Sequence, residues 1–184
     1  MLDAAAEVFA ARGIASSSVS DIAHAAGLTK GAVYSNFDSK DDLVLALMEE
    51  HVLQRLHNAL VAFDAADDVN DAVHDLGASL VDAIHADLGW QHLLFEYCGL
   101  ARRDPTLQAA LADRRRAGRA AVARAIERIA EARGVELPMS AADLAVAMLA
   151  ISNGLALETG MDPDGVPDDL FPRLIGLIVD RRVP

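Results

Sequence analysis

Residues 18–40 read SVSDIAHAAGLTKGAVYSNFDSK, and this stretch predicts two short helices joined by a tight turn. Ser18 can cap the first helix, and Asp21, three residues later, can complete a capping box over its free N–H groups. Gly27 can adopt the positive φ that a sharp turn between helices needs. Thr29 can then cap the second helix. This is the arrangement of a helix-turn-helix, in which the start of the second helix enters the DNA major groove.

A longer pattern surrounds this stretch: a first helix ends in F…G and is followed by S/T-V-x-D-I-A-x-A-A-G-V-S/T-K-G-x-x-Y-x-x-F-x-S-K-x-x-L. The residues of this chain that fit it are Phe9, Gly13, Ser18, Val19, Asp21, Ile22, Ala23, Ala25, Ala26, Gly27, Leu28, Thr29, Lys30, Gly31, Tyr34, Phe37, Ser39, Lys40 and Leu43. With them, the sequence from Leu2 to about Leu47 resembles the DNA-binding domain of the TetR family of bacterial transcriptional repressors. A lone helix-turn-helix pattern is weak evidence, whereas so many matches in one register are specific.

The resemblance implies a helix-turn-helix domain over residues 1–46 and a helical ligand-binding and dimerisation domain over residues 47–184. It implies a repressor that binds a palindromic, double-stranded operator DNA as a homodimer and is released by a small-molecule ligand. Two alternatives stay open. One is a constitutive dimeric DNA-binding protein without a ligand, and the other is a helical small-molecule binder or enzyme with a vestigial DNA domain.

The start of the second helix carries the groups that DNA recognition needs. A hydroxyl, a lysine and a backbone N–H at a helix start suit phosphate, and an asparagine can read adenine. The residues predicted to contact DNA are Ser18, Thr29, Lys30, Gly31, Tyr34, Ser35, Asn36 and Lys40. Lys30 and Lys40 are the only lysines in the chain. If both contact phosphate, a dimer neutralises about four phosphates, and log K falls with log[salt] at a slope of about −3.6.

Composition favours an all-α fold. Hydrophobic residues make up 53% of the 184 residues and aromatic residues 4%, and no stretch alternates as a strand does, so we expect about nine helices and no sheet. Besides the helix-turn-helix pair, the first expected helices run from Leu2 to near Gly13, from Lys40 to Phe63, and from the polar break at 64–70 to about Leu88. The later ones run over Trp90 to Ala101, Pro105 to Arg133, 141–158, and Pro172 to about Arg182. Gly89 is expected to end the fifth helix.

Several observations bear on location and partners. No window holds 18 consecutive apolar residues, and no charged segment followed by an apolar run resembles a secretion signal. The single cysteine, Cys98, excludes an intrachain disulfide and fits a reducing compartment. We therefore expect a cytoplasmic bacterial protein with no membrane partner. The net charge of −12 predicts weak long-range attraction to DNA.

The last helix predicts a dimer. Its apolar residues cover far more than one stripe, so it needs cover on two sides. The helix before it has small residues that permit close approach. In the TetR family the last two helices of each subunit form the dimer interface, and the residues expected there are Ala147, Ala150, Gly154, Leu174, Ile175 and Ile178. The alternative is a last helix buried wholly within one subunit.

The second region is the expected place for a ligand. Aromatic and apolar residues there can form pocket walls, and a few polar residues can orient a bound molecule. The candidate pocket residues are Trp90, His92, Phe95, Tyr97, Cys98, Met148, Asn153 and Leu155. The alternative reading is that most of them are ordinary core residues.

We expect neither catalysis nor a metal or cofactor. The six histidines do not show the spacing of a zinc site, since His51 and His57 lie on different faces of a helix and the predicted break at Gly89 separates His85 from His92. No Ser-His-Asp order, carboxylate pair or phosphate-binding glycine loop stands out. The sequence therefore does not predict an enzyme.

Overall fold

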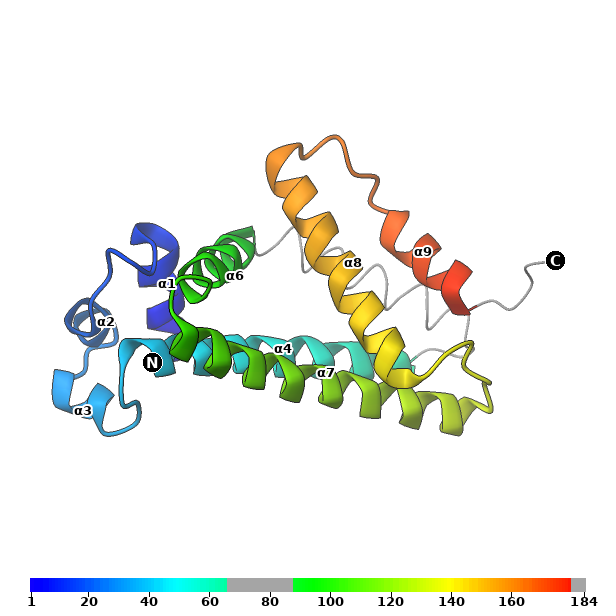
Figure 1. Cartoon of the computed structure of the whole chain (residues 1–184), viewed down its shortest axis with the longest axis horizontal. Coiled ribbons are helices and arrows are strands. Elements are labelled where there is room, and N and C mark those ends of the chain that lie inside the picture. The colour runs from blue at the N-terminus through cyan, green and yellow to red at the C-terminus, as the bar shows by residue number, and fades with distance from the viewer. Residues whose placement is uncertain (66–87, 180–184) are drawn as a thin grey trace. The chain divides into compact units, whose positions relative to one another are not determined.

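The computed structural model describes residues 1–65 and 88–179 (Figure 1). Within these ranges the chain forms eight helices and no strand. The helices are α1 (Leu2–Arg12), α2 (Val19–Ala25), α3 (Lys30–Tyr34), α4 (Lys40–Ala65), α6 (Leu88–Ala101), α7 (Pro105–Arg133), α8 (Ala141–Met161) and α9 (Leu170–Val179). The all-α fold is confirmed. The expected fifth helix, between the polar break at 64–70 and about Leu88, lies almost wholly outside the described residues, so the total of nine helices stays a prediction.

Capping residues start the helices of the helix-turn-helix as predicted. The Ser18 hydroxyl accepts the Asp21 N–H at 3.2 Å, and the Asp21 carboxylate accepts the Ser18 N–H at 2.9 Å, so the capping box is present. Thr29 Oγ1 accepts the Ala32 N–H at 3.1 Å. Gly27 has a φ of 65°. Both caps and the turn glycine are confirmed.

The longer helices begin in the same way. The Ser39 hydroxyl accepts the Asp42 N–H at 3.0 Å in the first turn of α4. The Asp104 carboxylate accepts the Thr106 N–H at 2.9 Å where α7 starts. The Ser140 hydroxyl accepts a first-turn N–H of α8 at 3.1 Å. These caps satisfy N–H groups that have no partner within the helix itself.

The predicted stop at Gly89 is wrong, because Gly89 is the second residue of α6. The residues that follow it, Trp90, Leu93 and Leu94, are buried in the core. Their packing outweighs the roughly 1 kcal/mol by which glycine disfavours a helix relative to alanine.

Other predicted helix ends shift slightly. α4 continues to Ala65 and α8 to Met161, both beyond their predicted ends. α9 begins at Leu170, so Pro172 lies in its first turn. The N–H groups of that turn have no partner within the helix, so a proline there costs no hydrogen bond. The predicted end near Arg182 lies outside the described residues.

The chain divides into two compact units. The first consists of residues 1–52 and 89–115, and the second of residues 53–88 and 116–184. Both α4 and α7 contribute residues to each unit.

The core of the first unit draws on α1, α2, α4, α6 and α7. Its largest fully buried side chains include Phe9, Ile22, Leu43 and Tyr97. A smaller cluster of Val19, Ala23 and Val33 lies within the helix-turn-helix, and Phe37 packs against both clusters. The helix-turn-helix therefore shares its core with the later helix α6 and the start of α7.

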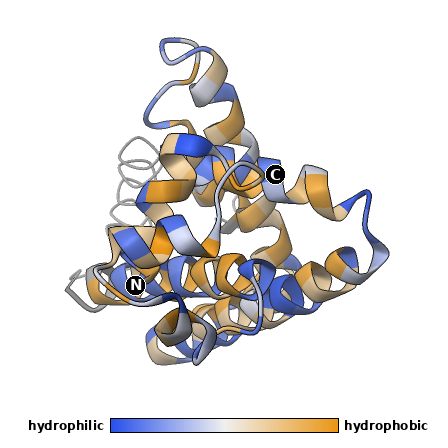
Figure 2. Cartoon of the chain, turned by 90° about the vertical axis from the view of Figure 1, so that its left-hand side faces the viewer, coloured by the Kyte–Doolittle hydropathy of each residue, from blue (hydrophilic) through white to orange (hydrophobic). Residues whose placement is uncertain are grey.

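The second unit has a cluster of small apolar residues where α7 and α8 pack, formed by Ala123, Ala141 and Ala145. Figure 2 shows that most helical turns carry hydrophilic and hydrophobic residues together, as expected for helices with one buried side. α8 is long and apolar enough to cross a membrane, with only 28% of its most apolar window buried within the chain. That composition is weak evidence for a span, because the interior helix of a soluble protein can share it.

Candidate nucleic-acid interface

The start of α3 forms an exposed polar surface. Thr29, Lys30, Gly31 and Tyr34 are all exposed. Lys30 Nζ lies 5.7 Å from the centroid of the Tyr34 ring, within the range of a cation–π interaction. The structure thus places a hydroxyl, a cation and an aromatic ring together at one helix start.

The other end of α3 uses two predicted contact residues in its own cap. Ser35 Oγ donates to the Ala32 carbonyl at 2.8 Å, and Asn36 Nδ2 donates to the same carbonyl at 2.9 Å. Both side chains are exposed. Each of these bonds uses one donor hydrogen and leaves the side-chain oxygen able to accept a hydrogen bond from DNA.

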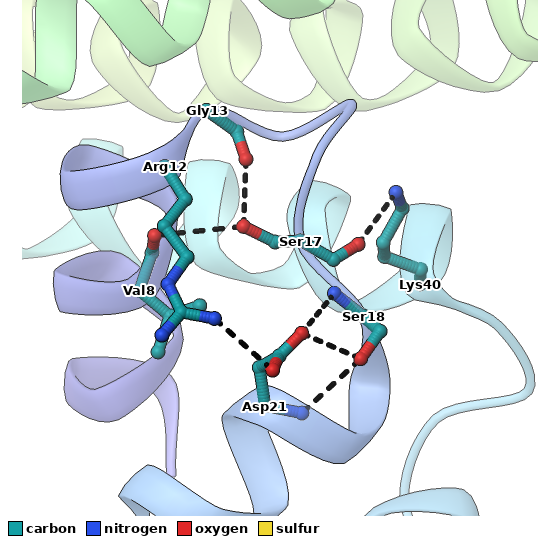
Figure 3. A network of polar contacts seen from close by, with 7 residues as sticks. All are labelled: Val8, Arg12, Gly13, Ser17, Ser18, Asp21 and Lys40. Carbon is teal, nitrogen blue, oxygen red and sulfur yellow. Dashed lines mark hydrogen bonds and ion pairs between the residues drawn. The ribbon is translucent and has the colours of Figure 1, made fainter.

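Ser18 and Lys40 support the turn between α1 and α2 (Figure 3). Lys40 Nζ donates to the carbonyls of Ile14 and Ser17 at 2.8 and 3.0 Å. Ser18 Oγ donates to Asp21 at 2.6 Å. Both of these predicted DNA contacts therefore have an internal role in the described structure, and their contact with DNA stays a prediction.

Asp21 connects α2 to α1. Arg12 Nη1 lies 3.1 Å from Asp21 Oδ1, in the ion pair drawn in Figure 3. The hydrogen bonds from Ser18, and after them the Arg12 guanidinium, hold the pKa of the Asp21 carboxyl below its ordinary value. The carboxylate is therefore kept in the charged form that caps α2.

Glu96 of α6 holds the same turn from another side, and sequence reasoning missed it. The N–H groups of Ile14 and Ala15 donate to its two carboxylate oxygens at 2.9 and 3.0 Å. Consecutive backbone N–H groups of a turn form a natural anion site. Glu96 lies 82 residues from Ile14 in sequence, so no local pattern could have revealed this contact.

Acidic side chains near the start of α4 are partly neutralised by α7. Arg114 of α7 forms ion pairs with Glu49 and, at 3.7 Å, with Asp42. The side chains of these ion pairs are half-exposed, so each pair contributes about 0–1 kcal/mol to the free energy of unfolding.

The predicted pocket residues fall in both units. Within the first, Trp90 and Tyr97 are buried, Phe95 and His92 are exposed, and Cys98 is half-buried. The Trp90 ring stacks on His51 with centroids 3.9 Å apart. Burial raises the pKa of the Cys98 thiol.

The remaining pocket candidates, Met148, Asn153 and Leu155, are half-buried residues of α8 in the second unit. A surface hollow of about 530 Å³ in the same unit is lined by Glu127, Ala130, Glu131, Gly134, Val135, Glu136 and Leu137. It contains no predicted pocket residue, so the pocket stays a prediction.

The predicted dimer residues differ in exposure. Ala150 and Gly154 are exposed, Ala147, Leu174 and Ile178 are half-buried, and Ile175 is buried within its own chain. Over residues 1–65 and 88–179, no group of three or more His, Cys, Asp or Glu side chains is placed to hold a metal ion.

Comparison with known proteins gives matches along most of the chain. Residues 1–47 match the family model of bacterial regulatory proteins of the tetR family, and residues 69–184 match that of the BetI-type transcriptional repressor C-terminal region. The regulator TtgR of Pseudomonas putida is 37% identical over 71 residues, 39% of this chain and 33% of TtgR. The repressor KstR2 of Rhodococcus jostii is 50% identical over 44 residues, 24% of this chain and 22% of KstR2. These matches span a third or less of the relatives' length.

Two solved structures share the fold at low identity. The fatty acid degradation regulator FadR of Bacillus halodurans aligns with a TM-score of 0.75 and 16% identity, over 100% of this chain and 97% of that one. FadR of Bacillus subtilis, solved in complex with stearoyl-CoA, aligns with a TM-score of 0.71 and 16% identity. The alignment covers 97% of this chain and 96% of that one. At this identity the likeness concerns the fold alone.

Proposed function

Because this chain belongs to the TetR family of bacterial transcriptional regulators, we propose that it represses transcription as a homodimer on a palindromic operator and is released by a small-molecule ligand. The observation that carries the proposal is the exposed start of α3. There Thr29, Lys30 and Tyr34 lie together on a helix whose other side is anchored in the core through Val33.

Gly31 supports contact with DNA at this surface. A Cβ added at Gly31 would meet only the Thr29 hydroxyl, at an ordinary 3.8 Å, so the fold itself does not require glycine there. Glycine costs a helix roughly 1 kcal/mol relative to alanine. The absence of a side chain at Gly31 is explained if the DNA sugar-phosphate backbone must approach the start of α3 closely.

The proposed dimer rests on α8 and α9. α8 is apolar yet mostly not buried within its own chain, and Val146 and Leu177 are 50% and 68% exposed. Small residues at Ala147, Ala150 and Gly154 let another helix approach closely. A second copy would cover this apolar surface. Binding of the dimer to a palindromic operator then requires the two α3 helices to lie about 34–36 Å apart, the distance between successive major grooves.

Because Ile175 is already buried within its own chain, with 4% exposure, the interface proposal rests on the other five predicted residues. The proposed ligand would bind in the helical region beyond the helix-turn-helix, in the cytoplasm of a bacterium. It can shift the protein off DNA only by its difference in affinity for the two states.

The decisive experiment titrates the purified protein with the DNA upstream of its own gene at low salt and follows fluorescence anisotropy. We expect binding, weakened for every sequence in Lys30→Ala. The matched control is Arg103→Ala, which removes one positive charge from an exposed residue after α6. Equal loss in both variants, no binding by the wild type, or a monomer in ultracentrifugation would overturn the proposal.

The ligand part needs a separate measurement. Thermal shift against a small-molecule library, repeated with operator DNA present, should find a compound that stabilises the free protein and weakens its DNA complex. A protein that binds the operator and responds to no compound would be a constitutive DNA-binding protein.

A further inference from the structure

Gln91 of α6 is a buried side chain whose hydrogen bonds are unmade. It is 2% exposed. Its amide nitrogen Nε2 and amide oxygen Oε1 are both closed to solvent, and neither has a hydrogen-bond partner. Most buried side-chain polar atoms in folded proteins have a partner, so an amide with both atoms unpaired requires an explanation.

This amide disfavours the ligand-free state. Burying an unpaired polar group loses its hydrogen bonds to water and returns nothing. A leucine of similar size would avoid that loss. A residue that lowers the stability of its own protein is typical of a position used for binding, where another molecule completes the bonds.

The surroundings of Gln91 on α6 are apolar. Helical spacing places Leu94, Phe95 and Cys98 on the same side of the helix as Gln91. Leu94 is buried, and Phe95 is partly exposed to solvent. The preceding residue, Trp90, stacks on His51 of α4. Gln91 is therefore the one side chain on this stripe of α6 that both donates and accepts strong hydrogen bonds.

We propose that Gln91 is the polar contact of a ligand site for an apolar molecule with one uncharged head group that both donates and accepts a hydrogen bond. A primary amide or a hydroxyl has this chemistry, because each can complete the carboxamide's donor and acceptor at once. A charged head would need an opposite charge to offset its desolvation, and a carboxamide does not supply one. The inference rests on the proposed ligand-responsive function and assigns the class of ligand.

The closed amide also constrains how the ligand binds. Since neither amide atom touches solvent, the packing around Gln91 must open for a ligand to reach it. Glu96 on the same helix holds the turn between α1 and α2 through two hydrogen bonds. An opening that moves α6 would therefore act on the turn between α1 and α2, which supports the helix-turn-helix.

The test uses Trp90, the only tryptophan of the chain, as a fluorescent reporter next to Gln91. Wild-type protein is titrated with octanamide and 1-octanol, and with octanoate and octyltrimethylammonium as charged probes, at pH 8. We expect the two neutral probes to change the emission and to bind at least about tenfold more tightly than the charged ones.

The variant Gln91→Leu separates binding from structure. We expect its Tm to rise by about 2–4 °C and its affinity for octanamide to fall about tenfold or more. Gln108→Leu is the control, because Gln108 is exposed on α7, and it should change neither quantity. A lower Tm in Gln91→Leu would show that the amide supports the fold, and would overturn the proposal.

The remaining outcomes are equally decisive. Unchanged octanamide affinity in Gln91→Leu, tighter binding of a charged probe, or no response to either neutral probe would each overturn the ligand class. Operator binding without any probe is measured in parallel. If the operator is bound and the probes fail, only this inference falls. If the operator is not bound, the proposed function fails, and the probe titration still decides whether Gln91 binds a ligand.

Discussion

Gly27 is required by the backbone, whereas Gly99 is not, and the difference is measurable. A Cβ added at either position would meet no atom within 4 Å, so contacts play no part. Gly27 has a φ of 65°, in the left-handed region that disfavours a side chain by roughly 1–2 kcal/mol. Gly99 lies within α6, where alanine is favoured by up to about 1 kcal/mol.

We therefore expect Gly27→Ala to lower the free energy of unfolding by about 1–2 kcal/mol, and Gly99→Ala to raise it by up to about 1 kcal/mol. Urea unfolding followed by circular dichroism measures both. A change of the same sign in the two variants would contradict this account of the turn.

Tyr97 predicts a particular sensitivity to alkali. It is fully buried, and its hydroxyl has no hydrogen-bond partner. Burial first, and then the carboxylates of Asp41, Asp104 and Asp42, raise the pKa of Tyr97 above its ordinary value. Above the ordinary tyrosine pKa of about 10, the unfolded chain loses this proton while the folded protein keeps it. This difference in pKa leaves the free energy of unfolding unchanged below a pH of about 10 and lowers it as the pH rises further.

Tyr97→Phe removes this titration. We expect its Tm to equal or exceed that of the wild type at pH 7, because an unpaired buried hydroxyl is removed. Between pH 9 and 11 the advantage of the variant should widen. Tyr34→Phe, at an exposed position, is the control and should follow the wild type. A gap that does not widen with pH would contradict the prediction.

At the scale of elements, the turn between α1 and α2 is held from two sides by opposite charges. Glu96 accepts two of its N–H groups, and Lys40 donates to two of its carbonyls. Glu96→Gln keeps the size of the side chain but replaces one acceptor oxygen with an NH₂ group that faces a donor. We expect the free energy of unfolding to fall by about 1–2 kcal/mol and the operator affinity to fall with it, while helix content is unchanged.

The control for Glu96→Gln is Glu50→Gln, an identical change at an exposed position of α4. Urea unfolding and anisotropy with operator DNA compare the two variants. Equal operator affinities of the two variants would mean that the hydrogen bonds between Glu96 and this turn do not position the helix-turn-helix.

The elements also show what a sequence can predict. Ser18, Thr29 and Ser39 cap helices within three residues of themselves, so local pattern was enough to place those helix starts. The helix end predicted at Gly89 was wrong because burial of the residues after it outweighs the low helix propensity of glycine, which is about 1 kcal/mol. Glu96 and Gln91 act through tertiary environment, and nothing in the residues adjacent to them reveals it.

For the whole molecule, the sequence was most informative about its first quarter. DNA imposes the same helix-turn-helix geometry on many proteins, so residues 18–40 carry a recognisable pattern. A ligand domain only has to pack helices around an individual molecule, which many sequences can do. The predicted domain boundary at residue 46 stays a prediction, since the first compact unit also contains residues 89–115.

The salt dependence of operator binding measures how many phosphates the cationic side chains of the dimer neutralise. The chain has a net charge of −12, and the ammonium of Lys40 already binds two carbonyls. Arg12 is likewise paired with Asp21. Lys30 is then the main cation for phosphate, so a dimer neutralises about two phosphates. We expect log K to fall with log[salt] at a slope of about −1.8, half the value predicted when both lysines contact DNA.

Two variants decide between these slopes in anisotropy titrations from low to moderate salt. Lys30→Ala should bring the slope close to zero, because it removes the phosphate contact of each subunit. Lys40→Ala should lower the Tm and leave the slope near that of the wild type, because two of its ammonium N–H groups hold it on the carbonyls of Ile14 and Ser17. A wild-type slope of about −3.6 that is halved by Lys40→Ala would instead place Lys40 on phosphate. The bonds from Lys40 to Ile14 and Ser17 would then have to break or be shared when DNA binds.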